Sequence, residues 1–227
     1  MAIDWEALER ALVDLSKADI NKFAAKHGDE TFYGFAFDCN SEYGQVLLCL
    51  NSQTQLRGMA VKYSSGDTPG QDAWAKIHRE MNELLKKHGV SPSEKPRKTP
   101  EEEEVALRWS LGDWKYQGFN SPKFKKIWNP FEVAVSDLCT DEQEDENTFM
   151  TPTQDRFMRA ACRAVIRLES EGAFAVLKRT KDFKTYVADH DELEEESWSR
   201  LQAVGQKLTS AGGKKAARRA SRRKPDA

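Results

Sequence analysis

Two short apolar segments near the N-terminus constrain the fold more than any other feature of the sequence. Residues 31–37 read Thr-Phe-Tyr-Gly-Phe-Ala-Phe and residues 45–50 read Gln-Val-Leu-Leu-Cys-Leu, with a turn-rich stretch between them. Segments this short and this rich in aromatic and aliphatic residues favour strands over helices, so they predict a hairpin. The preceding segment, 4–27, places apolar residues at helical spacing and ends at Gly28. We therefore expect an amphipathic helix packed on one face of the hairpin.

The rest of the chain alternates between helical periodicity and short strand-like segments. Two helices begin at strong start signals, Ser121-Pro122 and Thr151-Pro152, where a capping side chain precedes a proline. We predict an α+β fold, a layered α/β sandwich with a central sheet of about five short strands flanked by amphipathic helices. Further helices are predicted at 71–88, 121–138, 151–171 and 191–208, and further short strands at 59–61, 105–109, 174–177 and 185–188.

The chain of 227 residues fits one globular domain, predicted at 1–210. Three prolines between residues 91 and 100 remove backbone donors and fix φ, so this stretch is expected to be an exposed connector. Residues 211–227 are predicted to form a disordered basic tail. Its cations are Lys214, Lys215, Arg218, Arg219, Arg222, Arg223 and Lys224.

The net charge of −2 hides an asymmetry between the body and this tail. Of the 35 basic and 37 acidic residues, seven basic residues and Asp226 follow Gly212. The remaining 28 basic and 36 acidic residues give the body a formal charge of −8. Such a body suits a basic partner, whereas the tail suits nucleic-acid phosphates.

The segment Arg108-Trp109-Ser110-Leu111-Gly112-Asp113-Trp114 holds two of the six tryptophans. Ser110 and Asp113 match the S-x-x-D start of a helix, so a strand is expected to turn sharply into a helix here, with Trp114 in the first turn and Arg108 paired to Asp113. We favour core packing for both tryptophans. The alternative is that Arg108, Trp109, Asp113 and Trp114 belong to an interaction surface.

An acidic stretch runs from Asp137 to Glu146. It lacks the D-x-[DN]-x-[DN]-G loop of a calcium site, so a solvated acidic loop is expected and no metal is predicted. The alternative is that the stretch contributes to a surface that binds a basic protein. Its candidate interaction residues are Glu142, Glu144, Asp145 and Glu146.

The sequence contains no recognisable catalytic constellation and no cofactor-binding pattern such as a P-loop or G-x-G-x-x-G. One further hypothesis is an enzyme in which Arg108, Asp113 and Tyr116 line a pocket beside the tryptophans. The four cysteines lack metal-ligand or redox spacing and are expected to be buried thiols. No secretory signal or membrane-spanning run is found, which predicts a cytoplasmic protein that does not insert into a membrane.

Several of these segments together resemble a family of uncharacterised bacterial proteins, domain of unknown function 4303. The resemblance covers most of 1–208 and implies a small cytosolic protein without an established activity. For some members, gene neighbourhood implies a role as immunity proteins against toxins delivered between competing cells. No functional residue is carried over, and the basic segment departs from the family pattern. The resemblance rests on the N-terminal amphipathic helix, Phe32-Tyr33-Gly34-Phe35-Ala36, Arg108-Trp109-Ser110 with Asp113-Trp114, and the helix, strand and acidic helix after Thr151.

These observations lead to three hypotheses about function, of which the first is the expected function and the other two are alternatives. The first is a non-enzymatic binding protein, most concretely an immunity-type inhibitor that neutralises a toxin by protein–protein contact through its acidic surface. The second is a nucleic-acid-associated protein that uses its basic tail, against which a merely solubilising tail must be weighed. The third is an enzyme of unknown reaction.

Overall fold

The computed structural model describes residues 3–66, 71–88, 97–143, 150–190 and 192–221. Its secondary structure is mostly helical, and in these residues a single three-stranded sheet has the order β2-β1-β3. The N-terminal half contains α1 (Trp5–Ala24), β1 (Phe32–Asn40), β2 (Gln45–Ser52), α2 (Gln53–Ser65), α3 (Gln71–Lys87) and α4 (Pro100–Leu107). The C-terminal half contains the 3-10 turn η1 (Leu111–Asp113), α5 (Pro122–Asp141), α6 (Pro152–Ser170), the 3-10 turn η2 (Ala173–Val176), β3 (Arg179–Asp189) and α7 (Glu194–Ser221).

The predicted hairpin is confirmed: β1 and β2 pair antiparallel, with Phe35 opposite Leu50. Gly44 closes its turn at φ +63°, a conformation that residues with a side chain rarely adopt. The third strand, β3, joins the other edge of β1 in parallel, with Ala36 opposite Tyr186. A register shift between Phe32 and Gly34 interrupts both ladders at the start of β1.

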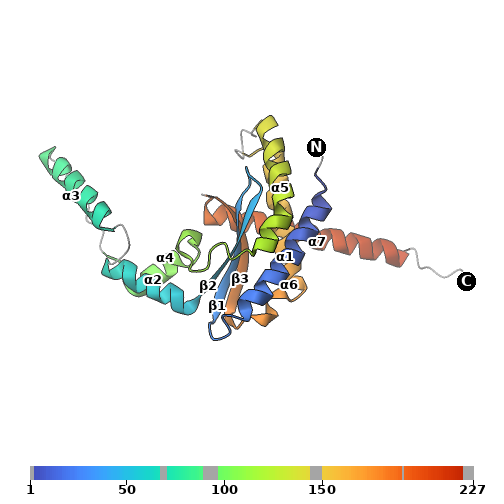
Figure 1. Ribbon diagram of the computed structural model, residues 1–227, viewed down its shortest axis with the longest axis horizontal. Helices are drawn as coiled ribbons and strands as arrows, with labels where there is room; N and C mark the ends of the chain where they lie inside the picture. The colour runs from blue at the N-terminus through green and yellow to red at the C-terminus, as the bar shows by residue number, and fades with distance from the viewer. Residues whose placement is uncertain (1–2, 67–70, 89–96, 144–149, 191, 222–227) are drawn as a thin grey trace, which may run out of the picture.

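One face of the sheet carries the main core. Phe35, Phe37 and Leu48 are fully buried there beneath α1, α5 and α6. Figure 1 shows these three helices gathered on one side of the strands, as the amphipathic pattern of 4–27 predicts. The indole N–H of buried Trp128 donates to the carbonyl of Gly44 at 2.9 Å, which fixes α5 to the hairpin turn. This side of the molecule therefore holds the sheet rigidly.

The opposite face of the sheet is covered less completely. Tyr33, Ala36 and Tyr186 pack there against α2, α4 and the 108–114 segment. Leu47, which points to the same face from β2, is 41% exposed. Part of this face therefore remains open beside the covering elements.

Three predicted strands are helical instead, which is why the sheet has three strands and not about five. Residues 105–107 are the end of α4 and 108–109 form the turn after it, because Thr99 and Glu102 form a capping box with Pro100 that starts a helix here. Residues 59–61 lie inside α2, which the Ser52 side chain caps. Residues 174–176 belong to η2, which follows Gly172 in the left-handed conformation at φ +67°. Side-chain capping thus prevails over apolar composition in α2 and α4.

Two helices extend away from the body (Figure 1). The predicted helix at 71–88 is confirmed as α3, which lies apart from the sheet. The expected disorder does not begin at 211, since α7 stays helical to Ser221, as suits a segment rich in alanine, lysine and arginine. Residues 91–96 of the connector predicted between 91 and 100 lie outside the described residues. Within the described residues, none of the helices is both long and apolar enough to span a membrane.

Candidate functional site

The 108–114 segment forms a turn that is hydrogen-bonded to both neighbouring strands. Tyr33 on β1 and the indole of Trp114 donate to the carbonyl oxygen of Arg108 at 2.8 and 3.1 Å. Tyr186 on β3 donates to the carbonyl oxygen of Trp109 at 2.7 Å. Burial raises the pKa of both tyrosine hydroxyls, so they remain protonated donors at neutral pH. The sheet therefore fixes the path of this turn.

Five aromatic side chains meet at this turn, and we call Tyr33, Trp109, Trp114, Tyr186 and Trp198 the aromatic cluster. The Trp109 ring lies edge-to-face with Tyr33, Tyr186 and Trp198 at centroid distances of 5.7, 5.7 and 5.4 Å. Tyr186 stacks on Trp198 at 5.1 Å. Trp114 is buried, whereas Trp109 is partly exposed. Core packing is thus the main role of Trp114, and Trp109 both packs and reaches the surface.

Two cations of the chain already lie against this cluster. The Arg108 guanidinium carbon lies 4.6 Å from the Tyr33 centroid, and Lys184 Nζ lies 5.6 Å from the Trp198 centroid. Both distances are within the range of a cation–π interaction. The cluster is therefore suited to hold positive charge.

The expected pairing of Arg108 with Asp113 is wrong. Arg108 bonds instead to Asp182 on β3 at 2.5 Å. Asp113 accepts from the hydroxyls of Tyr63 and Ser110 at 2.6 and 2.7 Å. The expected helix start is only the short η1, and Trp114 ends it rather than lying in its first turn. The backbone turns too early for the two charged side chains to meet.

A pocket of about 450 Å³ opens beside the aromatic cluster, on the open part of the sheet face. Its floor includes Asp38 on β1 and Tyr186 and Ala188 on β3, and the 106–112 turn and the start of α7 supply its walls. Four carboxylates line it, from Asp38, Asp189, Glu192 and Glu194. The described lining residues include one histidine, His190, but neither lysine nor arginine. The pocket therefore presents negative charge next to aromatic rings.

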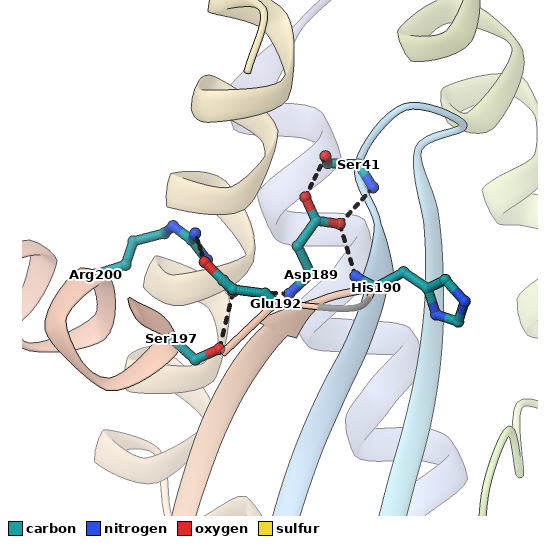
Figure 2. Close-up of polar contacts among 6 residues, drawn as sticks. All are labelled: Ser41, Asp189, His190, Glu192, Ser197 and Arg200. Carbon is teal, nitrogen blue, oxygen red and sulfur yellow. Dashed lines mark hydrogen bonds and ion pairs between the residues drawn. The ribbon is translucent and has the colours of Figure 1, made fainter. Parts of the chain in front are cut away.

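A polar network holds the acidic wall of the pocket in place (Figure 2). Glu192 accepts from Ser197 Oγ at 2.8 Å and from the Asp189 backbone N–H at 3.0 Å, and it forms an ion pair with Arg200. Asp189 accepts from Ser41 Oγ at 2.5 Å, as drawn in Figure 2. Arg200 therefore compensates Glu192 from within α7. The network joins the end of β3, the hairpin turn and the first turns of α7 into one rigid unit.

The other predicted interaction residues lie elsewhere or outside the described residues. Glu142 follows the end of α5 and accepts from the backbone N–H and hydroxyl of Thr153 at 2.8 Å each. These bonds lower the pKa of Glu142 although burial alone would raise it, so the carboxylate joins α5 to the start of α6. Glu144, Asp145 and Glu146 lie in 144–149, which the structure does not describe, and no side chain of the basic tail is described.

A second titratable cluster surrounds Glu30, away from the pocket lining. Glu30 accepts from Ser52 Oγ at 2.7 Å, lies 3.1 Å from His27 Nδ1 and bonds to the Tyr116 hydroxyl. Burial alone raises its pKa, but these hydrogen bonds outweigh it and lower the pKa below the usual value. Tyr116 is thus engaged with Glu30 and, like Arg108 and Asp113, is not among the residues that line the pocket.

The four cysteines lie in the core, and none of them lines the pocket. The prediction of buried thiols is confirmed for all four cysteines, and burial raises the pKa of Cys49 and Cys162 to about 12, which keeps them unreactive. No group of metal-binding side chains is found among the described residues. Sequence reasoning missed the pocket itself, because Asp38, Tyr186 and Glu194 come together only through the parallel pairing of β1 with β3.

A comparison with protein families connects the chain to one of them. The family model described as "Domain of unknown function (DUF4303)" matches residues 12–203. The chain belongs to this family. The family match ends before the basic segment, which begins at Gly212. It includes the aromatic cluster, every lining residue of the pocket and the Glu192–Arg200 pair. No curated protein and no solved structure matched the chain.

Proposed function

We propose that the chain is a non-enzymatic, cytosolic bacterial binding protein, and most concretely an immunity-type inhibitor that neutralises a toxin by protein–protein contact. The observation that carries the proposal is the acidic pocket beside the rigid aromatic cluster. Interfaces draw much of their binding energy from aromatic residues set in preformed, well-packed sites. A body with a formal charge of −8 adds long-range attraction for a basic partner.

The residues of the 108–114 turn support binding more than catalysis. Arg108 and Asp113 are each occupied by partners within the chain, Asp182 and Tyr63. Their contacts stabilise the turn and leave Trp109 at the edge of the pocket. A rigid surface of this kind loses little conformational entropy on binding, which favours affinity.

Electrostatic steering gives the proposal a kinetic test. The partner is first captured from a lysate of the source organism, with and without residues 212–227, and identified. Its association rate is then measured at low and high salt for the parent chain and for a variant with Glu101, Glu103, Glu144, Asp145 and Glu146 changed to lysine. Glu142 is left unchanged because it caps α6.

We expect the variant to associate at least tenfold more slowly at low salt and the difference to shrink at high salt, since salt screens exposed charges. A matched control changes the same number of exposed lysines to glutamate and should not slow association. An association rate that is unchanged by charge reversal at low salt would count against the proposal.

A second candidate function rests on the helical backbone of α7 up to Ser221. With 3.6 residues per turn, Lys214 and Arg218 lie one turn apart, as do Lys215 and Arg219, and the four positions share one side of the helix. Basic residues at helix positions spaced in this way suit a phosphate backbone. Nucleic-acid association through the tail is therefore kept as the alternative, and its test is given with the whole molecule below.

A further inference from the structure

The helix α3 carries apolar side chains that no described part of the chain covers. Ile77, Met81 and Leu84 lie along one side of the helix and are 47%, 51% and 57% exposed. Within the described residues, none of the other helices or strands packs along α3, which projects from the body in Figure 1. Most of the stability of a helix in a protein comes from packing of its apolar side, so we expect another surface to cover α3.

The spacing of these side chains indicates the kind of surface that covers them. Ile77 and Met81 are four residues apart, and Leu84 follows three residues later. In the sequence, Trp74 and His88 extend the same alternation of three and four in both directions. This alternation is that of the a and d positions of a coiled coil, with Met81 at a and Leu84 at d. We call Ile77, Met81, Leu84 and His88 the α3 seam, and the pattern is typical of a contact with a second helix.

Two charged residues beside the α3 seam indicate which helix fits. Glu80 and Lys87 are exposed, and each immediately precedes an a position, so both are g residues. In an antiparallel pair of helices the g positions of the two chains face each other. When Met81 packs against Leu84 of a second α3, Glu80 of each helix therefore lies opposite Lys87 of the other. In a parallel pair, Glu80 would face the apolar side chain of Leu85. Charge complementarity thus favours the antiparallel pair.

The charge of the whole molecule favours the same orientation. Because α3 projects from the body, an antiparallel pair places the two bodies at opposite ends of the joined helices. A parallel pair would bring two bodies, each with a formal charge of −8, to the same end. Like charges of this size repel one another.

We propose that α3 binds α3 of a second copy of the chain in the antiparallel orientation. Met81 packs against Leu84 of the other copy, and Glu80 pairs with Lys87, so that each contact occurs twice. The pair has two-fold symmetry and therefore closes at a dimer. In this register Trp74 lies at the end of the paired segment. The α3 seam is separate from the acidic pocket, so the inference does not depend on the proposed function.

The oligomeric state of the full chain tests the inference, and sedimentation equilibrium measures it. We expect a monomer–dimer equilibrium with a dissociation constant on the order of 100 µM, because so short a seam buries an area at the low end of specific interfaces. Met81→Glu should weaken dimerisation at least tenfold, because it places a charge in the seam. Urea unfolding at low protein concentration should be the same for this variant and the parent, since α3 does not pack on the described core.

A charge exchange tests the orientation and the register. At low salt, Lys87→Glu should weaken dimerisation at least threefold, because it creates two like-charge contacts. Adding Glu80→Lys restores opposite charges and should return the dissociation constant to within about twofold of the parent value. Lys86→Glu is the matched control, because it makes the same change of charge at an exposed residue that faces away from the seam. It should leave dimerisation unchanged, and Glu80→Lys should not strengthen it.

Several outcomes would overturn the inference. One is a chain that stays monomeric at about 1 mM, tenfold above the expected dissociation constant. Another is a dimer that Met81→Glu does not weaken, which would assign dimerisation to a different surface. Equal weakening by Lys87→Glu and Lys86→Glu, or no recovery on adding Glu80→Lys, would exclude the antiparallel register. If the chain is monomeric and instead binds vesicles of phosphatidylcholine and phosphatidylglycerol, the apolar side of α3 belongs to a lipid surface and the inference falls as well.

Discussion

Gly34 sets how closely the 108–114 turn approaches the sheet. A Cβ at this position would lie 2.9 Å from Trp109 Cζ3 and 2.9 Å from Trp114 Cη2. Such contacts are too short, so an added methyl group must displace two large rings that are held by hydrogen bonds and ring contacts on several sides. The absence of one side chain on β1 thus makes room for the aromatic cluster.

We predict that Gly34→Ala destabilises the protein by about 1 to 3 kcal/mol, the usual cost of overpacking a core. Urea unfolding followed by tryptophan fluorescence measures the change. Gly112→Ala is the matched control, because a Cβ at Gly112 meets nothing within 4 Å, and its effect should stay within about 0.5 kcal/mol. Equal stability of the Gly34 variant and the parent would show that the rings are not packed as described.

The Glu30 cluster makes a residue-scale prediction about acid. Hydrogen bonds from Tyr116, Ser52 and His27 lower the pKa of Glu30 in the folded state. Its contribution to stability is therefore present above the unfolded pKa of about 4.3 and is lost as the pH falls through the lower folded pKa. When the parent is compared with Glu30→Gln, the contributions of the other carboxylates to the pH dependence of stability cancel, because both proteins contain them.

We expect Glu30→Gln to be less stable than the parent by a constant amount from pH 7 to about pH 5, and the gap to narrow below about pH 4. Urea midpoints measured at pH 7, 5, 4 and 3 follow the gap. A gap that stays constant down to pH 3 would contradict a lowered Glu30 pKa.

At the scale of elements, sequence reasoning succeeded where one local signal dominated. The hairpin, the caps at Ser121 and Thr151 and the acidic start of the last helix are all present. It failed at 105–109 and 174–177, where short apolar runs look alike in a strand and in a helix. The Thr99-Pro100-Glu101-Glu102 box was the available signal for α4. The parallel partnership of β1 with β3 depends on tertiary packing, so the pocket that it creates could not be foreseen.

The helix α2 offers a prediction of opposite sign from that at Gly34. Gly58 is exposed inside this helix, and a Cβ there meets nothing within 4 Å. Alanine restricts the unfolded chain and favours the helix, so Gly58→Ala should stabilise the protein by about 0.5 to 1 kcal/mol. Thermal and urea unfolding measure the gain, and a loss of stability would indicate that α2 is not helical at Gly58.

For the whole molecule, the boundary between body and tail separates the residues that stabilise the fold from the cations of the basic tail. Val204 is the last residue of α7 that is buried within the described side chains, and the family match ends at residue 203. The cations that follow Gly212 therefore lie beyond both the described core and the shared family region. Folding and any attraction for phosphates should be separable by truncation.

We predict that removing 212–227 leaves the free energy of unfolding within about 0.5 kcal/mol of the parent, because no described core contact is lost. If the tail binds nucleic acid, the truncated chain also loses retention of a DNA duplex in a mobility assay. In that case a full-length variant with the seven cations changed to glutamine loses DNA retention to the same extent. DNA retention by the parent chain also falls steeply as the salt concentration rises, because binding releases counterions. Retention by the glutamine variant would assign the interaction to the body. That result would be at odds with the body's charge of −8, because a negative body repels the phosphate backbone.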